Sequence, residues 1–154
     1  MIRRERTMMI DARPDVVWDV IGRFMHVDEY APLVTSVDAM TEGPDGVGSK
    51  RRCHFEDGNS VVEEVTEWDP NHRYRVRLSE TSPMPLKEAY AEICIKPQGQ
   101  GRTLVVWSIE FRMKYGPLGW LMGQTLLKIM MGKVIDGNLR GLADKVRVPR
   151  ALAA

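Results

Sequence analysis

Several features that mark common protein classes are missing from this chain of 154 residues. It has only two cysteines, Cys53 and Cys94, which lie far apart and form no CxxC pair. Neither a disulfide framework nor a cysteine-based zinc site is therefore expected. No apolar run approaches the length of about 18 residues typical of a transmembrane helix. The N-terminus also lacks the apolar stretch of a signal peptide, so we expect a cytoplasmic protein.

The chain also lacks an excess of charge and any catalytic signature. Lys+Arg 22 against Asp+Glu 21 leave a net charge of +1, which argues against a nucleic-acid-binding protein. His26, His54 and His72 fall in different segments, and none has a second ligand at metal-binding spacing. There is no P-loop, dinucleotide fingerprint or nucleophile elbow, and Cys53 has no evident base. We expect no metal and no cofactor.

The composition is that of a soluble globular protein, with 44% hydrophobic and 28% charged residues. The length corresponds to one domain, which we place at residues 1–148, followed by a short flexible tail at 149–154. The 10 methionines are the unusual feature, because methionine fills irregular space and lines adaptable binding surfaces.

Apolar periodicity predicts an α+β fold. A first strand at residues 2–10 precedes two short helices, one ending near Gly22 and one at residues 26–30. A period of two, interrupted by turns such as 57–59, then predicts six strands. They span residues 33–40, 48–56, 60–68, 73–80, 86–96 and 103–114. After residue 117, apolar spacings of three and four predict one helix of about 28 residues that covers one face of an antiparallel sheet.

Five short segments carry a family resemblance: residues 12–18 (ARPDVVW), 30–34 (YAPLV), 48–51 (GSKR), 62–70 (VEEVTEWDP) and 103–107 (TLVVW). With these five segments in this order, the chain resembles the START/birch-pollen-allergen (SRPBCC) superfamily over about residues 2–146. Within it, the chain is most similar to the polyketide cyclase/dehydrase-like branch of small bacterial proteins. The resemblance implies the helix-grip fold, in which a curved seven-stranded antiparallel sheet wraps around a long C-terminal helix. Tyr30 stands where the family usually has tryptophan, which bears on ligand preference.

The resemblance also implies a tapering cavity between the sheet and the helix. Strand alternation and helix periodicity supply candidates for its lining. The two faces of the strand that carries Tyr90 are too similar to distinguish, and the same residues could instead form a closed core. Thr125 and Gly132 indicate either free space at mid-helix or a close approach of helix and sheet. The expected lining comprises Tyr30, Cys53, Phe55, Glu63, Tyr74, Val76, Leu78, Tyr90, Trp107, Ile109, Phe111, Met113, Met122, Thr125 and Ile129.

Arg51 is the charged residue expected inside this cavity, because it shares a strand face with Cys53 and Phe55. A buried arginine needs an acidic partner or a ligand acceptor. The resemblance favours Glu63, since the family often places an acid on the cavity side at this point.

The register of the hairpin leaves an alternative open. A four-residue turn at 69–72 puts Glu63 on the face of Leu78, whereas a three-residue turn puts Glu64 there. We prefer Glu63, although both glutamates could pair with surface arginines on the next strand instead.

Three functions fit these features. We favour a carrier or binding protein for a hydrophobic small molecule, such as a lipid, polyketide or isoprenoid. The alternative is a polyketide aromatase/cyclase-type enzyme, in which Arg51, Glu63 and Tyr90 polarise carbonyls and move protons while the cavity positions the substrate. The third is an assembly role with a partner protein. The protein would be a monomer or a homodimer, and the helix surface around Met122 would allow transient contact with a membrane.

Overall fold

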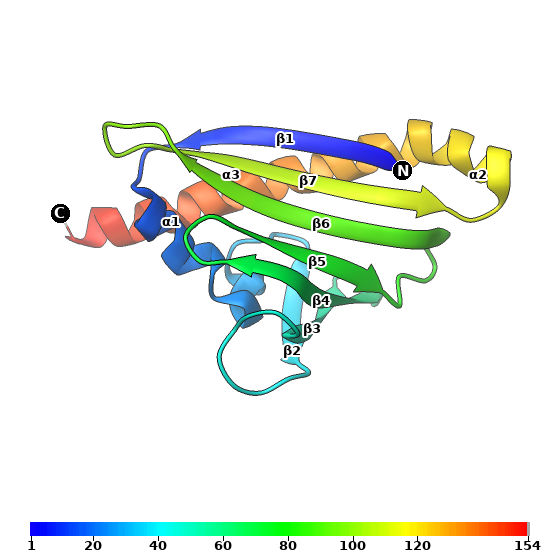
Figure 1. Cartoon of the computed structure of the whole chain (residues 1–154), viewed down its shortest axis with the longest axis horizontal. Coiled ribbons are helices and arrows are strands. Elements are labelled where there is room, and N and C mark those ends of the chain that lie inside the picture. The colour runs from blue at the N-terminus through cyan, green and yellow to red at the C-terminus, as the bar shows by residue number, and fades with distance from the viewer. Residues whose placement is uncertain (154) are drawn as a thin grey trace.

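The computed structural model describes residues 1–153, with side chains up to residue 147 (Figure 1). Seven strands precede one long helical stretch. The strands are β1 (Ile2–Ile10), β2 (Val34–Ala39), β3 (Lys50–Phe55), β4 (Ser60–Asp69), β5 (Arg73–Ser79), β6 (Leu86–Pro97) and β7 (Thr103–Met113). The helices are α1 (Pro14–Ile21), the 3₁₀ segment η1 (Phe24–Glu29), α2 (Gly116–Met122), the π-helical segment η2 (Gly123–Leu127) and α3 (Lys128–Ala153).

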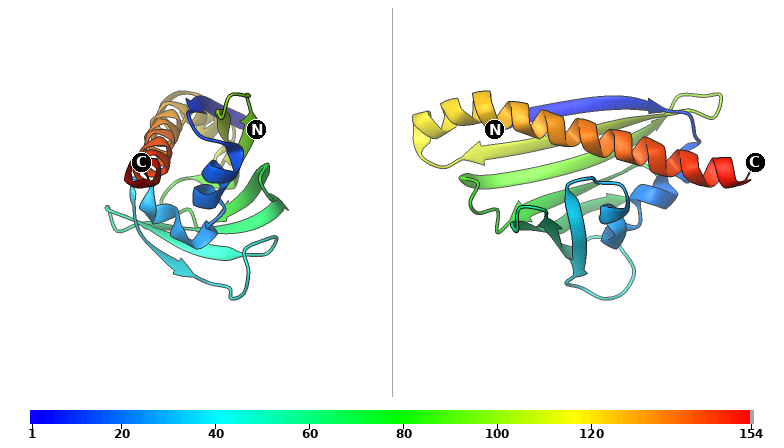
Figure 2. Two further views of the ribbon diagram at one scale, coloured as in Figure 1. Left: turned by 90° about the vertical axis from the view of Figure 1, so that its left-hand side faces the viewer. Right: turned by 180° about the vertical axis from the view of Figure 1, so that it is seen from behind.

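The strands form one antiparallel sheet in the order β1-β7-β6-β5-β4-β3-β2. Seen along α3, the sheet curls around one side of the long helix, and α1 and η1 close one end (Figure 2). This arrangement is the helix-grip fold and confirms the predicted seven-stranded sheet, the two short helices and the long C-terminal helix.

Side-chain alternation gives the sheet one apolar and one charged face. On β5, Tyr74 and Val76 are buried beneath the helix. Arg75, between them, points to the outer face, where its guanidinium lies 3.3 Å from Glu110 on β7. The core therefore fills the space between the inner face of the sheet and the helices, as the period-two pattern predicts.

The first part of the helical stretch, through α2 and η2, does not present the face that a regular helical period predicts, whereas Ile135, Leu139, Leu142 and Val146 of α3 are buried as that period predicts. The sheet side of the stretch carries Gly119, Gly123, Leu127, Met131 and Ile135, at a constant spacing of four. A regular α-helix would drift away from this spacing, but the π-helical turn of η2 accommodates the extra residues.

This geometry corrects three expected cavity residues. Met122, Thr125 and Ile129 are exposed on the outer side of the helix, and the Thr125 hydroxyl donates to the Leu121 carbonyl at 2.9 Å. The prediction failed because it assumed a regular helical period through η2.

A close approach joins the second half of α3 to the end of η1. A Cβ atom at Gly141 would lie 1.8 Å from the carbonyl oxygen of Tyr30, so only glycine fits there. The helix thereby fixes the segment that carries Tyr30.

The end of the long helix lies beyond the predicted domain boundary. The backbone of residues 149–153 continues α3. The flexibility expected for the tail stays a prediction, and residue 154 lies outside the described residues. None of the helices that the structure describes is long and apolar enough to cross a bilayer.

Candidate functional site

A group of polar side chains lies inside the grip, on the apolar side of the sheet. It comprises Tyr30, which follows η1, Arg51 and Cys53 on β3, Glu63 on β4 and Tyr74 on β5. We call these five residues the interior polar group.

Glu63 joins this group because of a β-bulge. The β4–β5 hairpin has a three-residue turn at 70–72, and that register alone would place Glu64 opposite Leu78. The irregularity at residues 65–67 shifts the pairing by one, so that Glu63 is the residue opposite Leu78. The structure thus places Glu63 on the inner face, by a route different from the four-residue turn that we considered.

Arg51 is held by three neighbours at once. Its Nε lies 2.9 Å from Oε2 of Glu63, and a second guanidinium nitrogen donates to the same oxygen. The third nitrogen donates to the Phe24 carbonyl, and the guanidinium lies 3.9 Å from the centre of the Phe24 ring. Burial acts to lower the pKa of Arg51, but the Glu63 carboxylate and the surrounding hydroxyl and thiol groups raise it overall. The pair is therefore charged and internally neutralised.

The hydroxyl groups of Tyr30 and Tyr74 form no hydrogen bond of good geometry with the described residues. They nonetheless lie near one another, and Tyr74 lies near Arg51, since each of these contacts shifts the pKa of the phenol concerned. Tyr30 and Tyr74 are only 4% and 2% exposed. Burial is the main cause that raises the pKa of both phenols, so both keep their protons and can donate. Each such hydroxyl costs about 1–3 kcal/mol when left unpaired in a protein interior. A ligand oxygen would satisfy them.

Cys53 lies beside the ion pair but is unsuited to nucleophilic chemistry. Burial, reinforced by the nearby Glu63 carboxylate, raises the pKa of the Cys53 thiol to about 12. The thiolate, which is the reactive form, is therefore absent near neutral pH.

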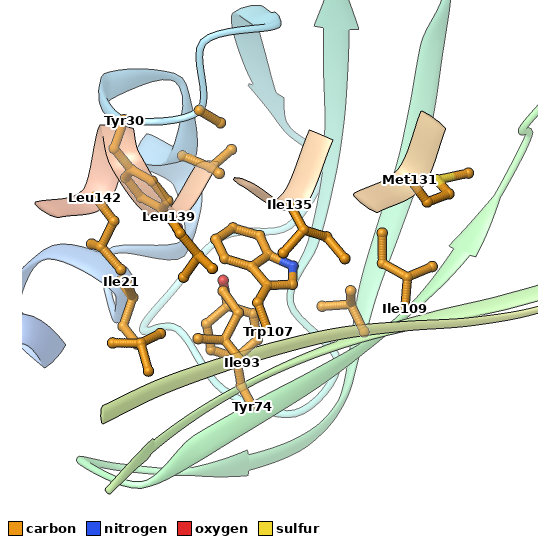
Figure 3. Packing of buried hydrophobic residues seen from close by; sticks show 14 of the residues in the cluster. Ile21, Tyr30, Tyr74, Ile93, Trp107, Ile109, Met131, Ile135, Leu139 and Leu142 are labelled. Atoms are coloured by element: carbon orange, nitrogen blue, oxygen red, sulfur yellow. The ribbon is translucent and has the colours of Figure 1, made fainter. Parts of the chain in front are cut away.

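Apolar side chains surround the two hydroxyls. The Trp107 ring lies edge-on to Tyr30 with centroids 6.4 Å apart, and Trp68 stacks on Tyr74 at 5.3 Å. Figure 3 shows Tyr74 and Trp107 rising from the sheet toward Ile135 and Leu139 of α3. A few oriented donors within an apolar lining are typical of a site for a small molecule.

A hollow of about 670 Å³ lies at the end of the sheet where β5 meets β6, around the connection between these two strands. Its apolar lining includes Leu78, Met84, Leu86 and Ala89. Arg77, Glu88 and Tyr90 of the outer face line it as well, and none of the five residues of the interior polar group does. A second hollow of about 400 Å³, beside the start of α2, shares Lys87, Lys114 and Tyr115 with the first.

The other expected lining residues divide into two sets. Phe55 and Leu78 are half-buried against the core, and Val76 and Ile109 are buried within it. The structure does not bring the remaining two, on β7, to the interior polar group. They are Phe111 and Met113, which pack beneath Gly123 at the α2 end of the helical stretch.

Tyr90 is the fourth correction, because it lies on the charged outer face of the sheet. Its register partners are Arg77 and Glu110, its ring lies 4.6 Å from the Arg75 guanidinium, and its hydroxyl donates to Glu88 at 3.0 Å. The alternation of β6 alone could not decide this, since apolar residues occupy both of its faces.

Two arginines that we did not single out occupy the inner side of edge strand β1. Arg4 and Arg6 share the inner face of the strand with Ile2 and Met8, beneath α3. Gly132 makes room for them, since a Cβ atom there would lie 2.7 Å from Nε of Arg4, and Arg6 pairs with Asp136 at 3.2 Å. Gly132 thus marks a close approach of helix and strand. The alternation in residues 2–10 was the available signal.

Within the part of the chain that the structure describes, no three histidine, cysteine, aspartate or glutamate side chains are grouped to hold a metal ion. The donors at the interior polar group are two phenols and an arginine that is already paired. They suit an organic oxygen better than a cation.

Comparison with family models decides the family. Residues 1–147 match the model described as polyketide cyclase/dehydrase and lipid transport. The chain belongs to this family. The description covers both enzymes and carriers, so membership does not choose between them. A search of curated proteins gives no match.

Solved structures support the same fold. The Zhui aromatase/cyclase from Streptomyces sp. R1128 is 19% identical with a TM-score of 0.79, over 95% of this chain and 93% of the other. The protein XoxI from Bacillus cereus is 20% identical with a TM-score of 0.76, over 95% and 96%. A protein from Thermus thermophilus is 21% identical with a TM-score of 0.76, over 96% and 99%. At these low identities the structural similarity shows the shared fold alone.

Proposed function

We propose that this protein is a carrier or binding protein for a hydrophobic small molecule that bears an uncharged oxygen. The observation that carries the proposal is the pair of buried, unpartnered hydroxyls of Tyr30 and Tyr74 beside the Arg51–Glu63 ion pair. A ketone or similar oxygen placed beside the two hydroxyls would accept a hydrogen bond from each of them. The family's description as cyclase/dehydrase and lipid transport fits such a ligand.

The charge balance of the site favours a neutral ligand group over a carboxylate. Arg51 is 5% exposed and already paired with Glu63. A ligand carboxylate would therefore bring an uncompensated negative charge into a buried site, which is costly. The hydrophobic body of the ligand, of lipid, polyketide or isoprenoid type, would lie against the apolar inner face of the sheet, which includes Val76, Trp107 and Ile109.

Native mass spectrometry of the purified protein tests this function. We expect a fraction of the protein to carry an apolar, oxygen-containing molecule, and a long-chain methyl ketone to displace it. Protein that runs only at its bare mass and binds neither that ketone nor the matching secondary alcohol would contradict the proposal.

One observation favours the alternative of a cyclase-type enzyme. Both hydrogen bonds from Arg51 end on Oε2 of Glu63, so within the described residues Oε1 is left without a partner. Glu63 is also more exposed than Arg51, at 16% against 5%. Oε1 could take a proton from the carbon next to a substrate carbonyl, while Tyr30 and Tyr74 donate to the oxygen that becomes an enolate.

Turnover of a linear polyketone distinguishes the two functions. An enzyme should lose at least about a hundredfold of its rate in Glu63→Gln, which removes the base. A carrier should bind the polyketone and return it unchanged. Circular dichroism of the variant confirms that the comparison is made on folded protein.

A further inference from the structure

The outer side of the helical stretch α2–η2–α3 exposes an unusual number of large apolar side chains. We call six of them the apolar stripe: Leu118, Leu121, Met122, Leu126, Ile129 and Met130. Leu118 and Leu126 are 72% and 67% exposed. Trp120 and Tyr115, at the start of the stretch, are exposed as well. Contiguous exposed apolar surface of this kind marks an interaction site.

The stripe is held outward by the packing of the opposite side. A Cβ atom at Gly119 would lie 1.7 Å from the Lys114 carbonyl oxygen, and one at Gly123 would lie 2.5 Å from Cδ1 of Ile2. The helix therefore sits directly on the sheet through its small residues and cannot roll the stripe inward. Figure 1 shows α2 at the edge of the molecule, beyond the end of β7.

The exposed apolar surface ends at mid-helix. One turn after Ile129 the exposed position is Lys133, and the outer positions that follow include Arg140, Asp144 and Arg147. The same helix thus has an ordinary charged outer side in its second half. The apolar stripe is a local feature and not a property of the whole helix.

The segment of the chain that carries the stripe has charges of one sign. Residues 111–135 contain Arg112, Lys114, Lys128 and Lys133 and no acidic residue, whereas the whole chain carries only +1. The three lysines form no ion pair with any described residue, and Arg112 is 4.0 Å from Glu88. Exposed apolar side chains flanked by free lysines, with tryptophan and tyrosine nearby, are suited to the interface of an anionic bilayer.

We propose that the apolar stripe and the lysines beside it dock this protein onto an anionic lipid surface. A second copy of the chain fits less well, because a symmetric interface would set two segments of +4 against each other. A bilayer buries the stripe and supplies the negative charge. The hollow that Tyr115 helps to line opens at the same end of the molecule. Docking itself does not depend on the proposed ligand.

Co-sedimentation with sucrose-loaded vesicles tests the proposal. The vesicles contain one part phosphatidylglycerol to two parts phosphatidylcholine, or phosphatidylcholine alone. We expect binding to the anionic vesicles that weakens with added salt, and little binding to the neutral ones. The fluorescence of the bound protein should shift to the blue, and the shift should be lost in Trp120→Phe.

Three variants separate the contributions. Leu126→Glu with Ile129→Glu should abolish binding, and Lys128→Glu with Lys133→Glu should weaken it by more than about tenfold. Arg140→Glu with Arg147→Glu makes the same total charge change as the double lysine variant but lies on the charged half of α3, so it should retain more than half of the affinity of the unaltered protein. Thermal unfolding of each variant should change little, because five of the six positions are exposed and Lys128 is only half-buried.

Two results would overturn the proposal. One is equal, weak sedimentation with both kinds of vesicle. The other is a concentration-dependent dimer in analytical ultracentrifugation that Leu126→Glu with Ile129→Glu disrupts, without vesicle binding. The latter would assign the stripe to a second copy of the chain.

Discussion

Tyr74→Phe should make the ligand-free protein more stable and ligand binding weaker. The change removes a buried hydroxyl that has no hydrogen-bond partner and keeps the ring stacked on Trp68. Since an unpaired buried polar group costs about 1–3 kcal/mol, we expect a gain near the lower limit. About 1 kcal/mol corresponds to a rise in Tm of about 2–4 °C for a domain of this size. Tyr30→Phe should behave in the same way.

The effect on binding has the opposite sign. In the complex, the hydroxyl donates to the ligand oxygen, and a hydrogen bond of this kind contributes about 0.5–1.5 kcal/mol. The Kd for a long-chain methyl ketone should therefore rise by about two- to tenfold in each variant. Tryptophan fluorescence titration measures the Kd, and differential scanning calorimetry measures the Tm.

Tyr90→Phe is the matched control, because it removes a hydroxyl of the same kind from the outer face of the sheet. There the hydroxyl is hydrogen-bonded to Glu88, so neither the ketone Kd nor the Tm should change by much. A lower Tm in both Tyr30→Phe and Tyr74→Phe, with an unchanged ketone Kd, would refute the reasoning, because the hydroxyls would then have partners within the protein.

Three further predictions concern the framework of the site. Glu63→Gln should lower the free energy of unfolding by about 3–5 kcal/mol in urea titrations, because Arg51 stays buried without its charged partner. Glu64→Gln on the outer face should have little effect. Equal losses in the two variants would be inconsistent with Glu63 as the buried partner of Arg51. Gly141→Ala should lower the free energy of unfolding by about 1–3 kcal/mol, because its Cβ atom would clash with the Tyr30 carbonyl. Gly137→Ala is the control one turn away, where a Cβ atom would lie 3.5 Å from Pro32, and it should raise the free energy of unfolding by about 0.5–1 kcal/mol. Burial raises the pKa of the Cys53 thiol from about 9 to about 12. Between pH 9 and pH 12 the thiol therefore loses its proton in the unfolded state and keeps it in the folded state, so the free energy of unfolding should fall as the pH rises through this range. Cys53→Ala should flatten this dependence in urea titrations at successive pH values, and an unaltered slope would argue that another group causes it.

The sequence predicted the strands, their succession along the chain and the inner face of most of them, because period-two alternation and turn residues act locally. Arg75 and Tyr74 on β5 are examples, since each lies on the face that its parity indicates. Tyr90 was misplaced because both faces of β6 carry apolar and polar residues, and only the pairing with Arg77 and Glu110 decides between them.

Irregularities of the backbone account for the other differences. The bulge at residues 65–67 inserts one residue into β4, so the side chains on one side of the bulge point to the opposite face from the one that regular alternation predicts. The π-helical turn of η2 likewise inserts a residue into the helix, so the buried face of the helix is rotated there. Neither has a distinct residue signature in this chain. The partner of Arg51 was correctly favoured through the family resemblance, although the hairpin turn considered for it differs from the one observed.

Infrared spectroscopy of a bound long-chain methyl ketone, labelled with carbon-13 at the carbonyl, tests the central claim most directly. Hydrogen bonds from Tyr30 and Tyr74 should lower the carbonyl stretching frequency well below its value in a hydrocarbon solvent. The shift should decrease in each single phenylalanine variant and disappear in the double variant. A bound ketone whose frequency equals that in hydrocarbon, or whose shift survives in the double variant, would contradict the account.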